Sequence, residues 1–285
     1  MKKILIIVVV IGLLTISIKF IKDKIKSRRI IAPYYDAQVF VRPSDSKHHN
    51  IAYTGLSVKG QIKIPIIMYH YVEYVKDIGD FIRKRLSINP YVFESQLATL
   101  NENHYTTYFV KDIPDILDGK INYSTRSAIL TFDDGYEDFY TDVFPLLKKY
   151  QIKATVYIIC DFIGRKGFLN PQEIKELAAS DLVEIGDHTM DHFYLKQALL
   201  KTADEQIINC KKELEENYGI TVKTFAYPYG AFAPETIELI RQLGFTAAVS
   251  VISGTEQSNQ NLFYLSRIRA GQFSGTNMVN VLEKK

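Results

Sequence analysis

The chain has 285 residues, 47% of them hydrophobic, which is enough for a sizeable core in one large domain or two small ones. Its formal net charge of +3 is unevenly spread. Residues 1–59 hold 11 Lys and Arg against 3 Asp and Glu, whereas the remainder holds 24 against 29, a net of −5. This mildly acidic remainder argues against a nucleic-acid partner, because phosphate binding needs a clustered basic surface.

The first residues are typical of a membrane segment. Residues 4–18 are almost wholly apolar and follow two lysines. A spanning helix needs about 20 apolar residues, so this one is short unless Lys19 extends its charge to the interface. A cleaved signal peptide is the alternative, but no small-x-small cleavage site follows. We therefore expect a membrane helix in residues 1–22, a linker or stalk in 23–60 with its Pro, Gly and polar cluster, and a globular domain in 61–285.

The membrane orientation of this segment is contested. Five basic residues follow it, and the positive-inside rule would then place the domain in the cytoplasm: Lys22, Lys24, Lys26, Arg28 and Arg29. The very short N-terminal tail favours the opposite orientation. We expect a single-pass membrane protein with an extracytoplasmic domain, although the positive-inside rule predicts the opposite orientation.

The globular part alternates between buried strands and amphipathic helices. Six short apolar runs predict strands at 64–71, 128–132, 154–160, 183–185, 224–227 and 245–251. Helical spacing and capping residues predict helices at 90–103, 138–150, 172–179, 202–218 and 234–243. This alternation predicts an α/β domain with a largely parallel sheet or barrel, in which chemistry lies just past the carboxyl ends of the strands.

The two cysteines are too few for a disulfide framework. Cys160 ends an apolar run and is expected to be a buried thiol, while Cys210 lies in a charged helical stretch. A disulfide between them is the less favoured alternative.

Carboxylates and histidines follow several of the predicted strands. Asp133 and Asp134 come directly after 128–132, His188 and His192 follow 183–185, and His70 lies in the first strand. On a helical turn, the i, i+4 spacing of His188 and His192 puts both rings on one side, about 5–6 Å apart at Cβ, which suits a single metal ion. The alternative is a pair of surface histidines and a solvated Asp-Gly turn. Their joint occurrence at strand ends favours the metal site.

These residues carry a family resemblance. Thr-Phe-Asp-Asp-Gly at 131–135 and His-Thr-Met-Asp-His at 188–192 resemble the first two motifs of the polysaccharide deacetylases, the NodB-homology family (carbohydrate esterase family four). Phe-Ala-Tyr-Pro-Tyr-Gly at 225–230 resembles the third. The resemblance spans roughly residues 64–270 and implies a distorted (β/α) barrel of about seven strands. It also implies hydrolysis of an acetamido or acetate ester group on a sugar.

The resemblance assigns roles to the motif residues. Asp134, His188 and His192 would ligate one divalent metal ion, most often zinc, with open positions for water and substrate. Asp133 would be the general base, and the backbone N–H of Tyr229 would support the oxyanion. Pro228 lies within the third motif and Tyr136 directly follows the first, and both are expected at the substrate.

The chain departs from the family pattern at two positions. A late histidine usually protonates the leaving amine, but no histidine follows His192. Residues 67–71 resemble the opening strand of the subgroup that deacetylates biofilm poly-N-acetylglucosamine, where the acid histidine comes early, so the role falls to His70; the alternative is an ordinary strand histidine. Ala226 replaces an arginine that orients the base in many members. Arg267 is the preferred substitute and Arg269 the alternative; both are equally compatible with ordinary strand-end ion pairs.

The resulting hypothesis is a membrane-anchored enzyme that removes N-acetyl groups from an N-acetylglucosamine-containing polysaccharide. Such a substrate lies outside the cell and supports the extracytoplasmic orientation. One alternative is a peptidoglycan or chitin-oligomer deacetylase or an acetyl-xylan esterase. Others are a non-catalytic carbohydrate-binding protein, and a cytoplasmic sugar-metabolite deacetylase, which the charge rule would favour. The sequence leaves the oligomeric state open.

Overall fold

The structure is a computed structural model that describes residues 60–77, 79–269, 271 and 275–283. The expected membrane helix at 1–22 and nearly all of the linker at 23–60 lie outside these residues. Within the described part of the chain, no helix is long and apolar enough to cross a membrane.

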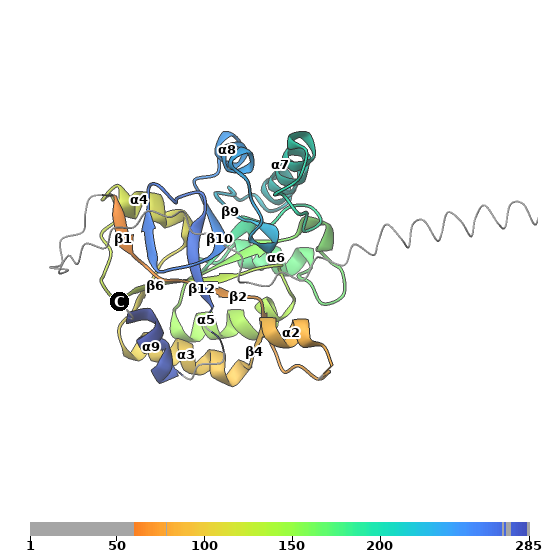
Figure 1. The fold of residues 1–285 in the computed structure, drawn as a ribbon. Coiled ribbons are helices and arrows are strands. Elements are labelled where there is room, and N and C mark those ends of the chain that lie inside the picture. Colours follow the sequence, from red (N-terminus) through yellow and green to blue (C-terminus); the bar gives the residue numbers. More distant parts are fainter. Residues whose placement is uncertain (1–59, 78, 270, 272–274, 284–285) are drawn as a thin grey trace, which may run out of the picture. The chain divides into compact units, whose positions relative to one another are not determined.

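Seven parallel strands form a closed barrel at the centre of the domain (Figure 1). The strands are β2 (Ile66–Tyr69), β6 (Ser127–Phe132), β7 (Ala154–Ile158), β8 (Val183–Asp187), β9 (Thr224–Ala226), β10 (Ala247–Ser253) and β12 (Leu265–Arg269). Their order around the barrel is β2-β12-β10-β9-β8-β7-β6, and β6 pairs again with β2 to close it. The expected barrel of about seven strands is therefore confirmed.

Short strands lie around the barrel. β5 (Thr106–Thr107) pairs with β6, β1 (Gln61–Lys63) pairs antiparallel with β11 (Glu256–Ser258), and β3 (Tyr71–Val72) pairs with β4 (Ser87–Ile88). The expected first strand at 64–71 is thus divided into β2 and β3, with His70 between them. β2 begins only after Pro65, which has no N–H to donate to a neighbouring strand.

Helices surround the barrel on several sides (Figure 1). They are α2 (Phe81–Leu86), α3 (Pro90–Glu102), α4 (Ile113–Leu117), α5 (Phe144–Tyr150), α6 (Pro171–Ala178), α7 (Leu200–Tyr218), α8 (Pro234–Gln242) and α9 (Gly275–Glu283). Helices α7 and α8 lie side by side, and α3, α5 and α9 pack together across the barrel from them. Short turns of 3₁₀ helix occur at Val110–Asp112, Cys160–Phe162 and Pro228–Gly230.

Capping residues explain where several helices begin and end. The side chain of Asn89 accepts a hydrogen bond from the Tyr91 N–H at the start of α3, and Asn170 does the same for α6. Gly219 ends α7 in the left-handed conformation. The expected helix at 138–150 instead opens as a π-helical turn, Phe139–Val143, before α5. Pro145 in the first turn of α5 lacks the N–H that a continuous α-helix would need there.

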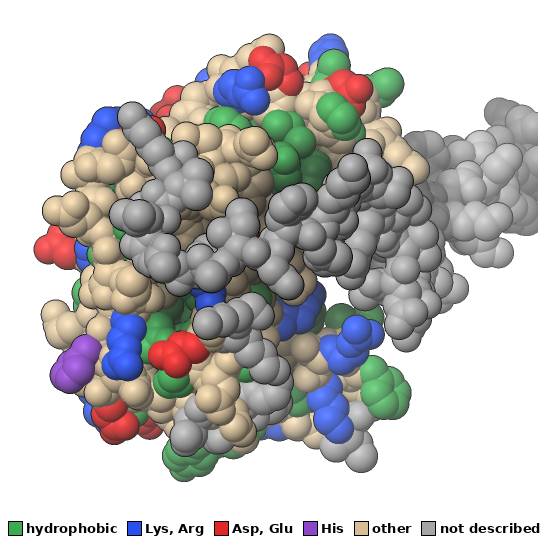
Figure 2. All heavy atoms as spheres, turned by 60° about the vertical axis from the view of Figure 1, so that its left-hand side comes forward, with side chains coloured by type: hydrophobic (Ala, Val, Ile, Leu, Met, Phe, Trp, Pro, Cys, Tyr) green, Lys and Arg blue, Asp and Glu red, His purple; other side chains and the backbone are tan. Residues whose placement is uncertain are grey.

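The core has two layers because both faces of the parallel strands are buried. Ile66 and Ile129 point into the barrel with Tyr157 and Leu265, whereas Ile67 and its neighbours pack between the barrel and the helices. On the face shown in Figure 2, acidic and basic side chains both occur among the coloured atoms, and several basic side chains lie near one another at its lower right.

Candidate metal centre

Asp134, His188 and His192 converge at the carboxyl ends of β6 and β8. Oδ1 of Asp134 lies 3.3 Å from Nε2 of His188 and 3.4 Å from Nε2 of His192. The three groups each offer a ligand atom, and these atoms all lie within 4.8 Å of one another. The sequence prediction placed these three residues together, and the structure does the same.

Hydrogen bonding prepares this cluster for a cation. Nδ1 of His188 lies 2.7 Å from the carbonyl oxygen of Ala226. A carbonyl oxygen can only accept, so Nδ1 carries a proton, and in the neutral ring Nε2 is then the nitrogen that can bind a metal. Oδ1 of Asp134 is itself buried without a hydrogen-bond partner. Burial acts to lower the pKa of His188, but Asp134 and Asp133 outweigh it and the pKa lies above its usual value. A metal cation between the two atoms, or a proton on Nε2 in the absence of a metal, would therefore satisfy the 3.3 Å contact.

The charge states of the cluster suit the same ion. Burial, together with the neighbouring His188 ring, lowers the pKa of His192 to about 4, so this ring is neutral near pH 7. Burial acts to raise the pKa of Asp134, but the surrounding imidazoles of His188, His70 and His192 outweigh it, and the pKa lies below its usual value. The cluster therefore offers the carboxylate of Asp134 and the neutral imidazole of His192, and the imidazole of His188 is oriented by the carbonyl oxygen of Ala226.

The two histidines lie on a loop and not on a helical turn. β8 ends at Asp187, and α7 begins only at Leu200. Thr189 and His192 adopt positive φ values of 68° and 62°, which no helical turn contains. The expected helical geometry was thus wrong, although the rings do meet, with centroids 4.9 Å apart. Positive φ at a β-branched residue such as Thr189 is rare and costs about 1–3 kcal/mol, so neighbouring contacts must hold this loop.

Asp133 lies beside the cluster in a buried ion pair. Nη1 and Nη2 of Arg267 donate to Oδ1 and Oδ2 of Asp133 at 2.7 and 2.8 Å. Burial acts to raise the pKa of Asp133, but the Arg267 guanidinium outweighs it and holds that pKa below its usual value. Asp133 is thus ionised near neutral pH. Arg269, the alternative partner, has an exposed side chain and is not the residue on Asp133.

Further contacts fix the guanidinium of Arg267. Its Nε donates to the carbonyl oxygen of Ser250 at 2.7 Å, and Nη1 also donates to the hydroxyl oxygen of Thr131 at 3.1 Å. Arg267 is only 1% exposed. Sequence reasoning did not assign a role to Thr131 or Ser250. The position of Thr131 two residues before Asp133, inside the otherwise apolar run at 128–132, was the one signal for it.

His70 follows β2 and faces the same space as Asp133. Its Nε2 lies 3.9 Å from Oδ2 of Asp133, and its side chain is 14% exposed. Burial lowers the pKa of His70, although Asp133 and Asp134 act to raise it. The early histidine is therefore brought to the metal centre. His104 lies elsewhere, exposed and with a positive φ of 57°.

The three predicted substrate residues lie close to the cluster. Tyr229 has a φ of 59° and is 52% exposed, and its ring centroid lies 4.3 Å from that of His192. Pro228 beside it is buried. Tyr136 stacks on Tyr71 with ring centroids 3.7 Å apart. These aromatic side chains offer apolar faces next to the polar centre, as sugar-binding sites require.

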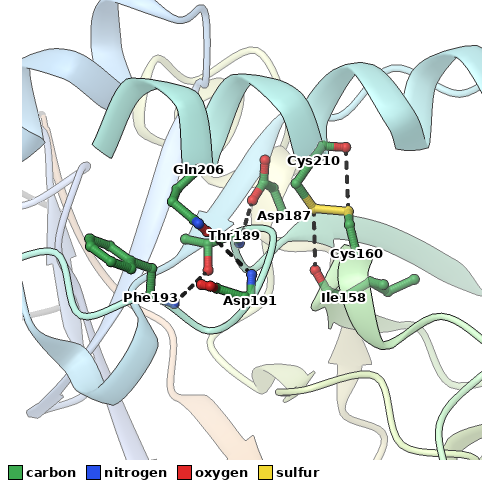
Figure 3. The surroundings of a disulfide bond; sticks show 8 residues. All are labelled: Ile158, Cys160, Asp187, Thr189, Asp191, Phe193, Gln206 and Cys210. Atoms are coloured by element: carbon green, nitrogen blue, oxygen red, sulfur yellow. Dashed lines mark hydrogen bonds between the residues drawn. A yellow bond between two sulfur atoms is a disulfide. The ribbon is translucent and has the colours of Figure 1, made fainter. Parts of the chain in front are cut away.

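Cys160 and Cys210 form a disulfide near this centre, so the expectation of a free buried thiol was wrong (Figure 3). Their Cα atoms are 5.5 Å apart although the residues are 50 positions apart in the chain. Both are almost fully buried.

The fold and the centre together define a class of protein: a (β/α) barrel with a two-histidine, one-carboxylate cluster at the carboxyl ends of its strands, beside an ionised aspartate. A sequence profile described as polysaccharide deacetylase matches residues 120–248. YxkH of Bacillus subtilis is 30% identical over 207 residues, which cover 73% of this chain and 71% of YxkH.

Two further relatives are informative. The poly-beta-1,6-N-acetyl-D-glucosamine N-deacetylase of Staphylococcus aureus is 30% identical over 221 residues, 70% of this chain and 76% of that protein. The deacetylase PplD of Streptococcus pyogenes, solved in complex with acetate, superposes with a TM-score of 0.72 and 28% identity over 78% of this chain and 99% of that one. The chain belongs to the polysaccharide deacetylase family, as its motifs indicated.

Proposed function

We propose that this protein is a metal-dependent hydrolase that removes N-acetyl groups from an N-acetylglucosamine-containing polysaccharide, with zinc as its metal. One observation carries the proposal: the adjacent carboxylates Asp133 and Asp134 point to different partners. Asp134 faces His188 and His192, and Asp133 is held by Arg267. Ligand and base are thereby separated although they are neighbours in the chain, because β6 has ended and Asp134 lies in a turn with a positive φ of 78°.

A divalent cation held by Asp134, His188 and His192 would polarise the acetyl carbonyl and lower the pKa of the attacking water. Asp133 accepts the proton of that water as its oxygen bonds to the carbonyl carbon. Arg267 keeps Asp133 ionised for this step and fixes its direction, since both carboxylate oxygens are hydrogen-bonded.

The C–N bond then breaks, and the sugar nitrogen takes a proton to leave as an amine. We assign this step to His70 in its protonated form, since its Nε2 lies 3.9 Å from Oδ2 of Asp133. The backbone N–H of Tyr229 is assigned to the oxyanion, and the rings of Tyr136 and Tyr229 to the sugar. The products are acetate and a free amine on the polymer.

The substrate is proposed from two relatives. One is named for the deacetylation of poly-beta-1,6-N-acetyl-D-glucosamine, and the other was solved with acetate. A carbohydrate-binding protein without activity needs neither an ionised Asp133 nor the buried guanidinium that holds it. That arrangement favours an enzyme over a binding protein.

The test is acetate release by the full chain from poly-N-acetylglucosamine, with and without a chelator. Asp133→Asn keeps the size of the side chain but removes its charge, and we expect a loss of about 10²–10⁴-fold. His104→Ala, on the exposed surface, is the matched control. Activity that survives both chelation and Asp133→Asn would refute the mechanism. Faster release from peptidoglycan, chitin oligomers or acetyl-xylan would reassign the substrate.

We also propose that an apolar helix within residues 1–22 anchors the domain at the outer side of the cell membrane. Support comes from the run of apolar residues at 4–18 and from the Cys160–Cys210 disulfide, since such bonds persist in oxidising compartments. Protease added to intact cells should degrade the membrane-bound domain. Protection of the domain until the cells are lysed would place it in the cytoplasm.

A further inference from the structure

The disulfide joins two elements that flank the metal centre. Cys160 opens the 3₁₀ turn Cys160–Phe162 just after β7, and Cys210 lies in the middle of α7. Figure 3 shows the bond beneath α7, with the loop that follows β8 beside it. That loop carries His188 and His192, while neither cysteine reaches the ligand cluster.

Each of these two elements binds the loop between the histidines. From the 3₁₀ turn, the N–H of Cys160 donates to the carbonyl oxygen of Thr189 at 3.2 Å, and the N–H of Asp161 donates to that of Met190 at 2.7 Å. From α7, the carbonyl oxygen of Gln206 accepts from the N–H of Met190 at 3.0 Å. The side-chain oxygen of Gln206 also accepts from the N–H of Asp191 at 3.2 Å (Figure 3).

The residues between the two histidines are therefore held from both sides, by the same two elements that the disulfide links. The conformation they hold is one that the loop does not favour by itself, because Thr189 and His192 both have positive φ. Two further hydrogen bonds lie within this segment. Oδ1 of Asp187 accepts from the backbone N–H of Thr189 at 2.7 Å, and the Thr189 hydroxyl oxygen accepts from the backbone N–H of Phe193 at 3.0 Å.

We propose that the Cys160–Cys210 disulfide is a positioning device for the metal centre: it fixes α7 against the turn after β7 and so keeps His192 in reach of Asp134. This inference rests on the proposed metal-dependent function. Both cysteines are positioning residues, since they touch neither metal nor substrate. Opening the bond does not change the three ligand side chains themselves. It frees α7 to move away from the turn, and the hydrogen bonds of Gln206 to the loop are then lost. The site then binds its ion less tightly.

The bond can be opened without a thiol reductant, which would itself bind the metal ion. A trialkylphosphine and one water convert the disulfide to two thiols, and the phosphine leaves as its oxide. The double variant Cys160→Ala/Cys210→Ala gives the same open state with no thiol to compete for the ion. Two routes to the open state separate the loss of the bond from the loss of the sulfur atoms.

The experiment is a calorimetric titration of the metal-free full chain with Zn²⁺. It compares the oxidised protein, the phosphine-reduced protein and the double alanine variant. We expect the open forms to bind with a dissociation constant about tenfold higher, a difference of about 1.4 kcal/mol. The control is Leu214→Ala, which removes a buried side chain one turn beyond Cys210 and away from Gln206. It should lower the stability of the fold and leave the dissociation constant within about twofold of the wild type.

Amide hydrogen exchange of residues 189–193 gives a second measurement that needs no metal, and it should accelerate on reduction. If the double variant does not fold, the reduced wild type still decides the question. An unchanged dissociation constant and unchanged exchange in the open forms would overturn this inference alone. A tenfold loss in Leu214→Ala as well would overturn it in favour of general destabilisation. No Zn²⁺ binding by the oxidised wild type would overturn the metal centre itself.

Discussion

Arg267 and Asp133 lie 134 positions apart in the chain yet meet through two parallel N–H···O bonds of 2.7 and 2.8 Å. The pair is almost fully buried, and its two-pronged geometry fixes the carboxylate in direction as well as in charge. In this chain the last barrel strand, β12, thus supplies the arginine that the motif at 225–230 lacks.

The first prediction concerns the geometry of that pair. Arg267→Lys keeps the positive charge but cannot donate two parallel bonds from a planar group. We expect kcat to fall by about 10–100-fold with little change in KM, because Asp133 stays ionised but loses its direction. Steady-state acetate release measures both constants. Arg269→Lys, on the exposed neighbour in β12, should leave both unchanged. An Arg267→Lys variant with full activity would show that the pair is only structural.

The second prediction separates the role of His70 from that of Asp133 by comparing two substrates with different leaving groups. An amine leaves an amide only after it is protonated, whereas a nitrophenolate leaves an acetate ester without a proton. His70→Ala should therefore lose about 10²-fold or more in N-acetyl hydrolysis and much less in the hydrolysis of nitrophenyl acetate. Asp133→Asn should lose both activities. Equal losses for His70→Ala on the two substrates would assign this histidine to binding or folding instead.

The third prediction concerns Asp138 and the pH dependence of stability. Oδ2 of Asp138 accepts from the N–H of Val72, while Oδ1 is buried without a partner. Burial, with a smaller effect of Glu73 and Asp142, raises the pKa of this carboxyl to about 7 from an ordinary value of 3.8. The folded state therefore holds a proton that the unfolded state releases between about pH 4 and 7. Stability must fall as pH rises through that window and level off above it.

Asp138→Asn removes this dependence while keeping an oxygen for Val72. Relative to the wild type, the variant should gain on the order of 3 kcal/mol in free energy of unfolding between pH 4.5 and 8. Urea unfolding at a series of pH values measures the difference, and other titrating groups cancel because both proteins contain them. Parallel curves for the two proteins would mean that Asp138 is ionised in the folded state.

The sequence predicted the centre better than the loop that builds it. Asp133, Asp134 and His188 were correctly placed by the rule that polar residues after parallel strands meet at one end of the sheet. The helical turn was wrong because the conformation of 188–192 depends on bonds from Cys160 and Gln206, which are distant in sequence. The spacing of the histidines alone cannot distinguish a helical turn from such a loop.

Local sequence patterns did not predict strand β12 or the disulfide. Strand β12 was not among the expected strands because the buried Arg267 interrupts its apolar residues, and an inward-facing arginine is recognisable only once its partner Asp133 is in place. The disulfide depends on a distance between Cα atoms, 5.5 Å, that only the packing of α7 against the 3₁₀ turn after β7 creates.

The fourth prediction concerns Gly230, which ends the turn that carries Tyr229. Gly230 has a φ of 66°, and a Cβ added there would lie 2.3 Å from Cγ2 of Val251 in β10. Gly230→Ala must therefore displace either the turn or the strand. Gly244→Ala is the matched control, because Gly244 also has a positive φ, 82°, but an added Cβ would meet no atom within 4 Å. The control should lose about 1–2 kcal/mol from backbone strain alone.

Gly230→Ala should lose about 3 kcal/mol or more in free energy of unfolding, because overpacking adds to the same strain. It should also lower acetate release in the fraction that remains folded, since Tyr229 lies against His192 and moves with the turn. Chemical denaturation and kinetics on the same preparations measure both effects. Equal destabilisation by the two substitutions would mean that β10 yields to the added methyl group. In that case Tyr229 would keep its place, and the activity of Gly230→Ala should match that of Gly244→Ala.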